Sequence, residues 1–178
     1  MMKRVLIEKA CKVKILLLDV DGVMTDGSLY FDNQGNEIKV FNIHDGHGIK
    51  RLRESGIRVA ILSGRTSPAV GTRARELSID EVYQGVADKL KVYETLLRKL
   101  KLRDEEAAFI GDDLPDLPVL KRVGFSISVF NGVDEVKDQV DWVTRRPGGR
   151  GAVREAADFI LSSRGREKDA RVPGFYKG

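Results

Sequence analysis

The sequence predicts an α/β protein built on one doubly wound, mostly parallel sheet. Three short apolar runs, 15–18, 57–62 and 107–110, each end in polar residues, which is typical of strands buried on both faces. Segments with helical periodicity separate these runs, most clearly the amphipathic segment 88–100. Strands that alternate with helices form parallel sheets, because each helix carries the chain back across the sheet.

Bulk composition indicates a globular protein. The chain has 178 residues, of which 42% are hydrophobic and 33% are charged, and it is long enough for one domain. No apolar run reaches the ~20 residues that span a bilayer, and Glu8 interrupts the apolar N-terminus, so we expect neither a membrane segment nor a signal peptide. The single Cys11 excludes an internal disulfide or a cysteine zinc site and suits the cytoplasm. A net charge of +4 fits a small anionic substrate and is too weak to indicate nucleic acid.

The remaining elements follow in order along the chain. Two β-rich runs, 28–31 and 37–41, flank an Asp/Asn/Gly turn and predict a hairpin. Residues 44–48 are expected to form a loop before a short helix, 49–55, which Gly56 ends. The later expected elements are a helix over 68–77 with Ser67 as its N-cap, a strand over 82–83, a helix over 115–121, strands over 125–129 and 142–143, and a closing helix over 152–161. We therefore expect a single domain over residues 1–161, with the hairpin as a flap over 28–41, and a basic tail over 162–178.

Candidate active-site residues follow three of the predicted strands. They are Asp19 and Asp21 after the first strand, Ser63 and Gly64 after the second, Asp112 and Asp113 after the third, and Lys89 at the start of a helix. Parallel strands end at one edge of a sheet, so we expect these residues to meet there. A carboxylate nucleophile, a proton donor and a cation are what phosphoryl transfer requires. Oxygen ligands without a histidine or cysteine cluster favour Mg²⁺.

In this order the motifs resemble those of the haloacid dehalogenase superfamily. They are Asp19-x-Asp21-Gly22-Val23-x-Thr25-Asp26, Ser63-Gly64-Arg65, Lys89, and Gly111-Asp112-Asp113-x-x-Asp116. Only the hairpin separates the first two motifs, which leaves no room for a cap domain. The hairpin together with segments 41–49 and 148–155 resembles the 3-deoxy-D-manno-octulosonate 8-phosphate (KDO 8-phosphate) phosphatases, over roughly residues 12–160.

This resemblance implies a role for each motif residue. Asp19 would be the nucleophile and Asp21 the general acid/base. Mg²⁺ would be held by the Asp19 carboxylate, the Asp21 carbonyl and Asp112, with Asp113 and Asp116 behind them. Ser63, the Gly64 N–H and Lys89 would bind the phosphoryl group. The implied substrate contacts are Asn42, Ile43, His44, Asp45, Gly46, Lys50, Arg65 and Arg73. For Arg73 the alternative is a side chain that only lies along its helix. His44 and His47 lack a third partner for a metal.

The resemblance also implies a homotetramer whose subunits complete one another's active sites. An isolated hairpin is only marginally stable in water and is too short to bury a sugar acid alone. Beyond Gly148-Gly149, which we expect to form a flexible hinge, Arg150 and Arg154 are expected to reach the carboxylate or phosphate of the substrate.

Three functions remain open at this point. The resemblance implies hydrolysis of KDO 8-phosphate to KDO and phosphate, in lipopolysaccharide precursor synthesis. A nine-carbon sugar-acid 9-phosphate of the sialic-acid type differs by one hydroxymethyl unit and is the alternative substrate. A phospho-accepting signalling module of the response-regulator type is less favoured, because an acid two residues from Asp19 suits turnover. A catalytically silent scaffold is disfavoured by the intact motif set.

Overall fold

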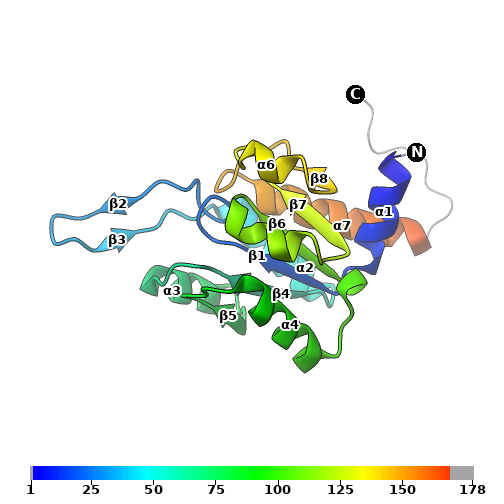
Figure 1. Ribbon diagram of the computed structural model, residues 1–178, viewed down its shortest axis with the longest axis horizontal. Helices are drawn as coiled ribbons and strands as arrows, with labels where there is room; N and C mark the ends of the chain where they lie inside the picture. Colours follow the sequence, from blue (N-terminus) through cyan, green and yellow to red (C-terminus); the bar gives the residue numbers. More distant parts are fainter. Residues whose placement is uncertain (1, 169–178) are drawn as a thin grey trace.

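The computed structural model describes residues 2–168 and confirms a mostly parallel α/β fold (Figure 1). Its central sheet has six strands in the order β5-β4-β1-β6-β7-β8, and every neighbouring pair is parallel. These strands are β1 (Ile15–Leu18), β4 (Arg58–Leu62), β5 (Glu81–Tyr83), β6 (Ala107–Gly111), β7 (Phe125–Ser128) and β8 (Trp142–Val143).

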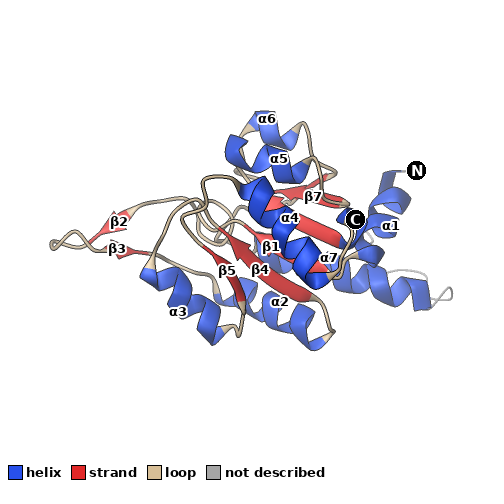
Figure 2. Ribbon diagram, turned by 60° about the horizontal axis from the view of Figure 1, so that its bottom comes forward, coloured by secondary structure: helices blue, strands red, loops and turns tan. Residues whose placement is uncertain are grey.

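Helices cover both faces of the sheet (Figure 2). One face carries α1 (Met2–Lys12), α2 (Ile43–Glu54), α3 (Pro68–Glu76) and α7 (Ala152–Lys168). The other carries α4 (Lys89–Leu100), α5 (Leu117–Leu120) and α6 (Asp134–Lys137), and two short 3-10 helices, η1 (Asp104–Glu106) and η2 (Leu114–Asp116), lie beside β6. In β1, Leu16 and Leu18 face the first layer while Ile15 and Leu17 face the second. This two-sided burial explains the uninterrupted apolar run.

The predicted hairpin forms and projects from the body of the molecule (Figure 1). Its strands, β2 (Tyr30–Phe31) and β3 (Glu37–Ile38), are antiparallel and shorter than the β-rich runs that predicted them. Asp32 stabilises the turn, because its Oδ1 accepts hydrogen bonds from the backbone N–H groups of Gln34 and Asn36, both at 2.8 Å.

Helix α2 begins at Ile43, so the prediction of a loop over 44–48 was wrong. Asn42 caps the helix, and its Oδ1 accepts a hydrogen bond from the His44 N–H at 2.8 Å. Gly46 and Gly48 predicted a loop, but they allow close packing instead. A Cβ on Gly46 would lie 2.2 Å from Arg73 Nη2, and one on Gly48 would lie 3.1 Å from Arg154 Cα.

Other differences concern two unpredicted helices and the length of the last helix. Helices α1 and α6 were not predicted. Helix α7 continues to Lys168, into the segment expected as a basic tail, and the rest of that segment, 169–178, lies outside the described residues. Across the part of the chain that is described, no helix combines the length and apolar character required to cross a membrane.

Candidate active site

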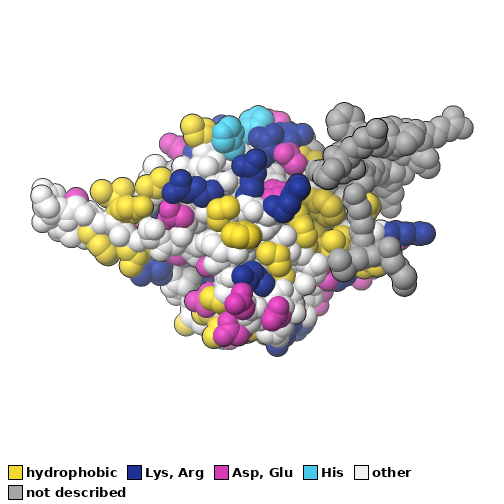
Figure 3. All heavy atoms as spheres, turned by 90° about the horizontal axis from the view of Figure 1, so that it is seen from above, with side chains coloured by type: hydrophobic (Ala, Val, Ile, Leu, Met, Phe, Trp, Pro, Cys, Tyr) yellow, Lys and Arg dark blue, Asp and Glu magenta, His cyan; other side chains and the backbone are white. Residues whose placement is uncertain are grey.

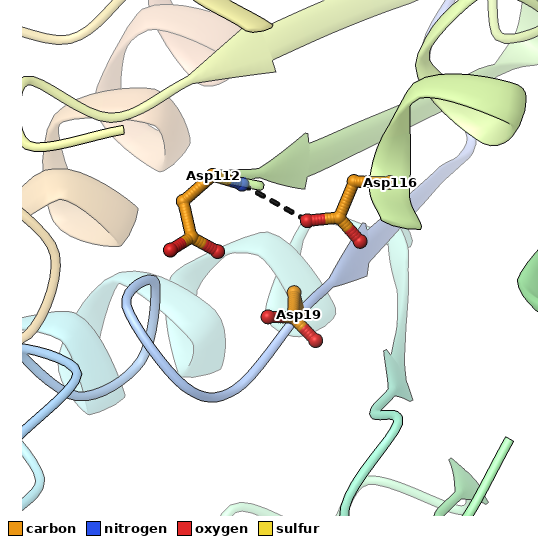
Figure 4. A group of neighbouring side chains, drawn as sticks. All are labelled: Asp19, Asp112 and Asp116. Atoms are coloured by element: carbon orange, nitrogen blue, oxygen red, sulfur yellow. Dashed lines mark hydrogen bonds between the residues drawn. The ribbon is translucent and has the colours of Figure 1, made fainter. Parts of the chain in front are cut away.

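Three carboxylates meet where the central strands end (Figure 4). Asp19 follows β1, Asp112 follows β6, and Asp116 ends η2. The register pairs Leu18 with Ile110, which brings the ends of the two strands level. One carboxylate oxygen of each aspartate lies within 4.8 Å of the others. Asp19 and Asp116 are buried, so like charges face one another in a poorly solvated place.

Asp116 is held in place by the backbone of β6 and the turn after it. Its Oδ2 accepts hydrogen bonds from the N–H groups of Asp112 at 3.0 Å and Asp113 at 3.3 Å. Gly111 leaves room for this contact, because a Cβ there would lie 2.6 Å from the Cβ of Asp116. Asp116 therefore aims its other oxygen at the cluster.

Lys89 supplies the cation beside these carboxylates. Asp88 caps α4 by accepting a hydrogen bond from the Lys91 N–H at 3.0 Å, which places Lys89 at the first helical position. The Lys89 Nζ donates to Asp19 Oδ1 at 2.7 Å and to Asp116 Oδ1 at 2.6 Å. Burial would lower the pKa of Lys89, but the two carboxylates outweigh it and raise that pKa. The ammonium is therefore charged at neutral pH.

Protonation equilibria in the cluster are strongly shifted. Burial, with Asp116 nearby, raises the pKa of Asp19 to about 6 despite Lys89. Burial and the neighbouring Asp19 and Asp116 raise the pKa of Asp112 to about 8. A bound divalent cation offsets this kind of repulsion.

The cluster has the donor set that Mg²⁺ requires. Asp112 Oδ1 is buried and accepts no hydrogen bond from any described residue. A buried carboxylate oxygen without a donor is costly unless a cation contacts it. Asp19 and Asp112 supply oxygen ligands of the hard type that Mg²⁺ prefers. The residues present therefore fit a magnesium ion.

The loop after β1 approaches Asp112 so closely that it needs glycine. Gly22 has a φ of +92°, and a Cβ there would lie 1.9 Å from Asp112 Oδ2. The loop then meets the segment before α7. A Cβ on Gly148 would lie 1.7 Å from the Gly22 carbonyl oxygen, and the Gly149 N–H donates to Val23 O at 2.9 Å. The expected flexible hinge at Gly148-Gly149 is thus a packed backbone contact, and that expectation was wrong.

Ser63 and Gly64 follow β4, which pairs in parallel with β1, so they lie at the same edge of the sheet as Asp19. Ser63 is buried, and its Oγ accepts a hydrogen bond from the Arg65 N–H at 3.2 Å. Gly64 is exposed, with nothing closer than 3.8 Å to the position of a Cβ. This geometry leaves the Gly64 backbone open to an anion.

Asp21 contacts two residues from the hairpin side of the molecule. Its Oδ1 accepts a hydrogen bond from Lys39 Nζ, and its Oδ2 lies 3.8 Å from Arg65 Nε. Glu37 contacts both cations, at 3.3 Å from Lys39 and 2.8 Å from Arg65. Neither Glu37 nor Lys39 was among the site residues predicted from the sequence. Their alternation with the exposed Ile38 was the available signal, since it places both on one side of the strand.

Several of the expected substrate contacts also make structural contacts within the chain. Both Asp45 oxygens cap α7, accepting hydrogen bonds from the Gly151 N–H at 3.2 Å and the Arg154 N–H at 2.8 Å. Arg73 donates to the Asn42 carbonyl at 3.3 Å and pairs with Glu76. Asn42 caps α2, and Gly46 allows α2 to pack closely against Arg73. Ile43, His44 and Lys50 are exposed.

A separate basic hollow lies where α2 and α7 begin. It measures about 730 Å³ and is lined by His44, Arg145, Arg146, Arg150, Gly151, Arg154, Glu155 and Asp158. None of the strand-end residues lines it. His44 and Arg150 thus share a surface, whereas Lys50 lines a different hollow with Arg53 and Glu76. Figure 3 shows histidine side chains beside a group of Lys and Arg side chains on one face.

Known proteins are similar to this chain in sequence and in fold. The family model of haloacid dehalogenase-like hydrolases matches residues 78–155. The 3-deoxy-D-manno-octulosonate 8-phosphate phosphatase of Yersinia pestis is 47% identical, covering 87% of this chain and 83% of its own length. The Escherichia coli K12 enzyme is 44% identical, covering 93% of this chain and 88% of its own length.

Solved structures agree with these sequence matches. The phosphatase of that name from Moraxella catarrhalis, in complex with magnesium, phosphate and KDO, superposes with a TM-score of 0.88 at 40% identity, covering 92% of this chain and 94% of that one. The Yersinia pestis crystal structure gives 0.89 at 44% identity, covering 93% and 89%. The predicted fold and family are confirmed. The chain belongs to the 3-deoxy-D-manno-octulosonate 8-phosphate phosphatase family of haloacid dehalogenase-like hydrolases.

Proposed function

We propose that the protein is a Mg²⁺-dependent phosphatase that hydrolyses KDO 8-phosphate to KDO and inorganic phosphate. One observation carries the proposal. The Asp112 Oδ1, buried without a hydrogen bond from the described residues, lies beside Asp19, which Lys89 pairs at 2.7 Å. This is a cation site next to a carboxylate nucleophile. The family relatives carry this activity in their names, and a related structure holds magnesium, phosphate and KDO.

The reaction has two steps, in which Asp19 carries the phosphoryl group and Asp21 transfers the proton. An Asp19 carboxylate oxygen attacks phosphorus while the bond from phosphorus to the sugar oxygen breaks, and Asp21 gives its proton to that oxygen. Asp21 then takes a proton from water, whose oxygen attacks the aspartyl-phosphate, releasing phosphate and restoring Asp19. Ser63, the Gly64 N–H and Lys89 bind the phosphoryl oxygens. Asp19, Asp112 and the Asp21 carbonyl would hold Mg²⁺, which neutralises charge on the phosphoryl group.

Substrate recognition divides between two surfaces. Arg65 lies beside Asp21 and is half-exposed, so it can meet the sugar acid at the mouth of the phosphate site. The basic hollow with His44 and Arg150 contains none of the phosphate-site residues of its own chain. Its arginines suit a carboxylate or phosphate, and we propose that they complete the site of a neighbouring subunit.

Apolar side chains on the hairpin support a homotetramer. Hydrophobic side chains gather along the hairpin in Figure 3, and the exposed ones are Leu29, Tyr30, Phe31, Ile38 and Val40. Contiguous apolar patches of this kind mark interaction surfaces. A second copy of this chain, presenting the same ribbon, matches the patch in length and character. Light scattering that gives a monomer would contradict shared active sites.

The function is tested by phosphate release from purified sugar-acid phosphates. We expect Mg²⁺-dependent turnover of KDO 8-phosphate and weaker turnover of a nine-carbon sugar-acid 9-phosphate. Asp19→Asn should abolish turnover and leave the fold intact. Equal or higher turnover of the nine-carbon substrate would reassign the substrate. Stable phosphorylation of Asp19 without turnover would favour a signalling module. We further propose that the enzyme acts in the cytoplasm, in lipopolysaccharide precursor synthesis.

A further inference from the structure

The hairpin reaches the proposed acid/base residue through one lysine. Lys39 follows β3, and only 4% of its side chain is exposed, although the hairpin itself is largely exposed. Its ammonium contacts the Asp21 carboxylate. A lysine on a surface ribbon normally directs its ammonium into water. Here the ammonium is turned into the site, at the cost of side-chain entropy.

Four charged side chains close a ring around this contact. Lys39 pairs with Asp21, and its Nζ lies 3.3 Å from Glu37 Oε1. Glu37 also pairs with Arg65 at 2.8 Å, and Arg65 Nε lies 3.8 Å from Asp21 Oδ2, which completes the ring. Two positive charges balance two negative charges. The ring joins the hairpin, the loop after β1 and the turn after β4. Both Asp21 oxygens thereby face a fixed cation, which restricts rotation of the carboxylate.

We propose that Lys39 is a positioning residue for Asp21, holding its carboxylate toward the reacting atoms, with Glu37 holding Lys39. Proton transfer therefore depends on where the hairpin lies, because movement of the ribbon withdraws Lys39 from Asp21. The role extends the proposed phosphatase function and rests on it. It assigns the hairpin a part in the chemical steps, in addition to subunit contact.

Lys39→Met tests the role, because methionine keeps most of the length and apolar stem of lysine. Lys121→Met, which removes an exposed lysine on the surface, is the matched control. We expect Lys39→Met to lower kcat about tenfold or more, with KM for the sugar-acid phosphate changed by at most about threefold. Lys39→Arg should recover part of the loss. Lys121→Met should match the wild type.

A double-mutant cycle separates positioning from direct substrate binding. If Lys39 acts only through Asp21, Asp21→Asn with Lys39→Met should be as slow as Asp21→Asn alone. Pre-steady-state hydrolysis of p-nitrophenyl phosphate gives a second measurement. Its good leaving group needs little proton donation, so a poorly placed Asp21 mainly slows hydrolysis of the aspartyl-phosphate. The burst of nitrophenolate should grow relative to the steady-state rate in both single variants.

Three results would overturn the inference. Wild-type kcat in Lys39→Met would remove any role in turnover. If the fold losses of kcat in the two single variants multiply in the double variant, Lys39 contacts the substrate independently of Asp21. A raised KM at unchanged kcat would show a binding role alone. If the wild-type protein releases no phosphate, the proposed function fails and this inference fails with it, whereas a fast wild type with a fast Lys39→Met variant refutes only the inference.

Discussion

The Lys89 ammonium lies 2.7 Å from the Asp19 carboxylate, and both side chains are buried. The same ammonium also pairs with Asp116 at 2.6 Å. One cation therefore serves two carboxylates in a poorly solvated place, which leaves an uncompensated negative charge. The proposed nucleophile Asp19, the proposed cation site and the charge of Lys89 are thus parts of a single electrostatic unit.

Lys89→Ala should lower kcat/KM strongly. The variant loses the cation beside Asp19, the proposed nucleophile, and removing one such donor costs about 3–4 kcal/mol of transition-state stabilisation. Steady-state kinetics at saturating Mg²⁺ measure the loss. Lys91→Ala, an exposed lysine half a turn further along α4, is the control. A loss of kcat/KM below about tenfold would mean that Lys89 only begins helix α4 and does not stabilise the transition state.

Magnesium affinity should weaken as pH falls. Burial and Asp19 raise the pKa of Asp112 to about 8, and burial and Asp116 raise the pKa of Asp19 to about 6. Protons therefore compete with the metal, and the dissociation constant should rise about tenfold per pH unit below about pH 8. Isothermal titration calorimetry at about pH 6.5 and pH 8.5 measures this. Equal affinity at both pH values would contradict it.

The metal-free protein should respond to pH in the opposite way. Because the folded-state pKa values of Asp19 and Asp112 exceed the ordinary value of 3.8, the folded chain binds more protons than the unfolded chain between about pH 4 and pH 8. Stability in EDTA is therefore expected to fall as pH rises through that range. Melting temperatures of the wild type and Asp112→Asn check this, since the variant should lose most of the dependence.

Asp45→Ala should destabilise the fold without removing a catalytic group. The Asp45 carboxylate caps α7 through Gly151 and Arg154, and loss of a cap costs about 1–2 kcal/mol. Urea unfolding measures the change, with exposed Asp80→Ala as the control. Asp45→Asn keeps one acceptor oxygen and should lose less. A raised KM for the sugar-acid phosphate at unchanged stability would instead show that Asp45 contacts the substrate.

Arg150→Ala should raise KM for the sugar-acid phosphate while hydrolysis of p-nitrophenyl phosphate, which lacks the carboxylate, stays unchanged. Among residues 2–168, the Arg150 side chain pairs only with Asp26, in an exposed contact at 3.4 Å, so stability should change by less than about 1 kcal/mol. Equal effects on both substrates would refute the shared-site model.

The features that could be predicted from the sequence are those that depend on regular patterns. The buried strands, their order with the helices, and the meeting of Asp19 with Asp112 all follow from periodicity and from the shared edge of a parallel sheet. The start of α2 was missed because Gly46 and Gly48 are poor helix formers, and only their tertiary neighbours explain them.

Long-range side-chain contacts could not be predicted in this way. Nothing local to Lys39 indicates that it reaches Asp21, because the path of the hairpin over the site depends on the whole fold. The same holds for Asp45, because nothing in its local motif indicates that it caps a helix that begins more than 100 residues further along the chain.

The backbone contact between Gly22 and Gly148 also has a consequence for biosynthesis. The ribosome makes the loop after β1 early, whereas Gly148 and Gly149 emerge only after every strand of the central sheet. A nascent chain can pair β1 with β4 and β6 before that, but the loop after β1, which carries the proposed acid/base Asp21, lacks the backbone that packs against it. Such long-range closure is slow and comes late in folding. Chains that lack Gly148 and Gly149 are therefore expected to have no phosphatase activity, even when every strand of the central sheet has been made.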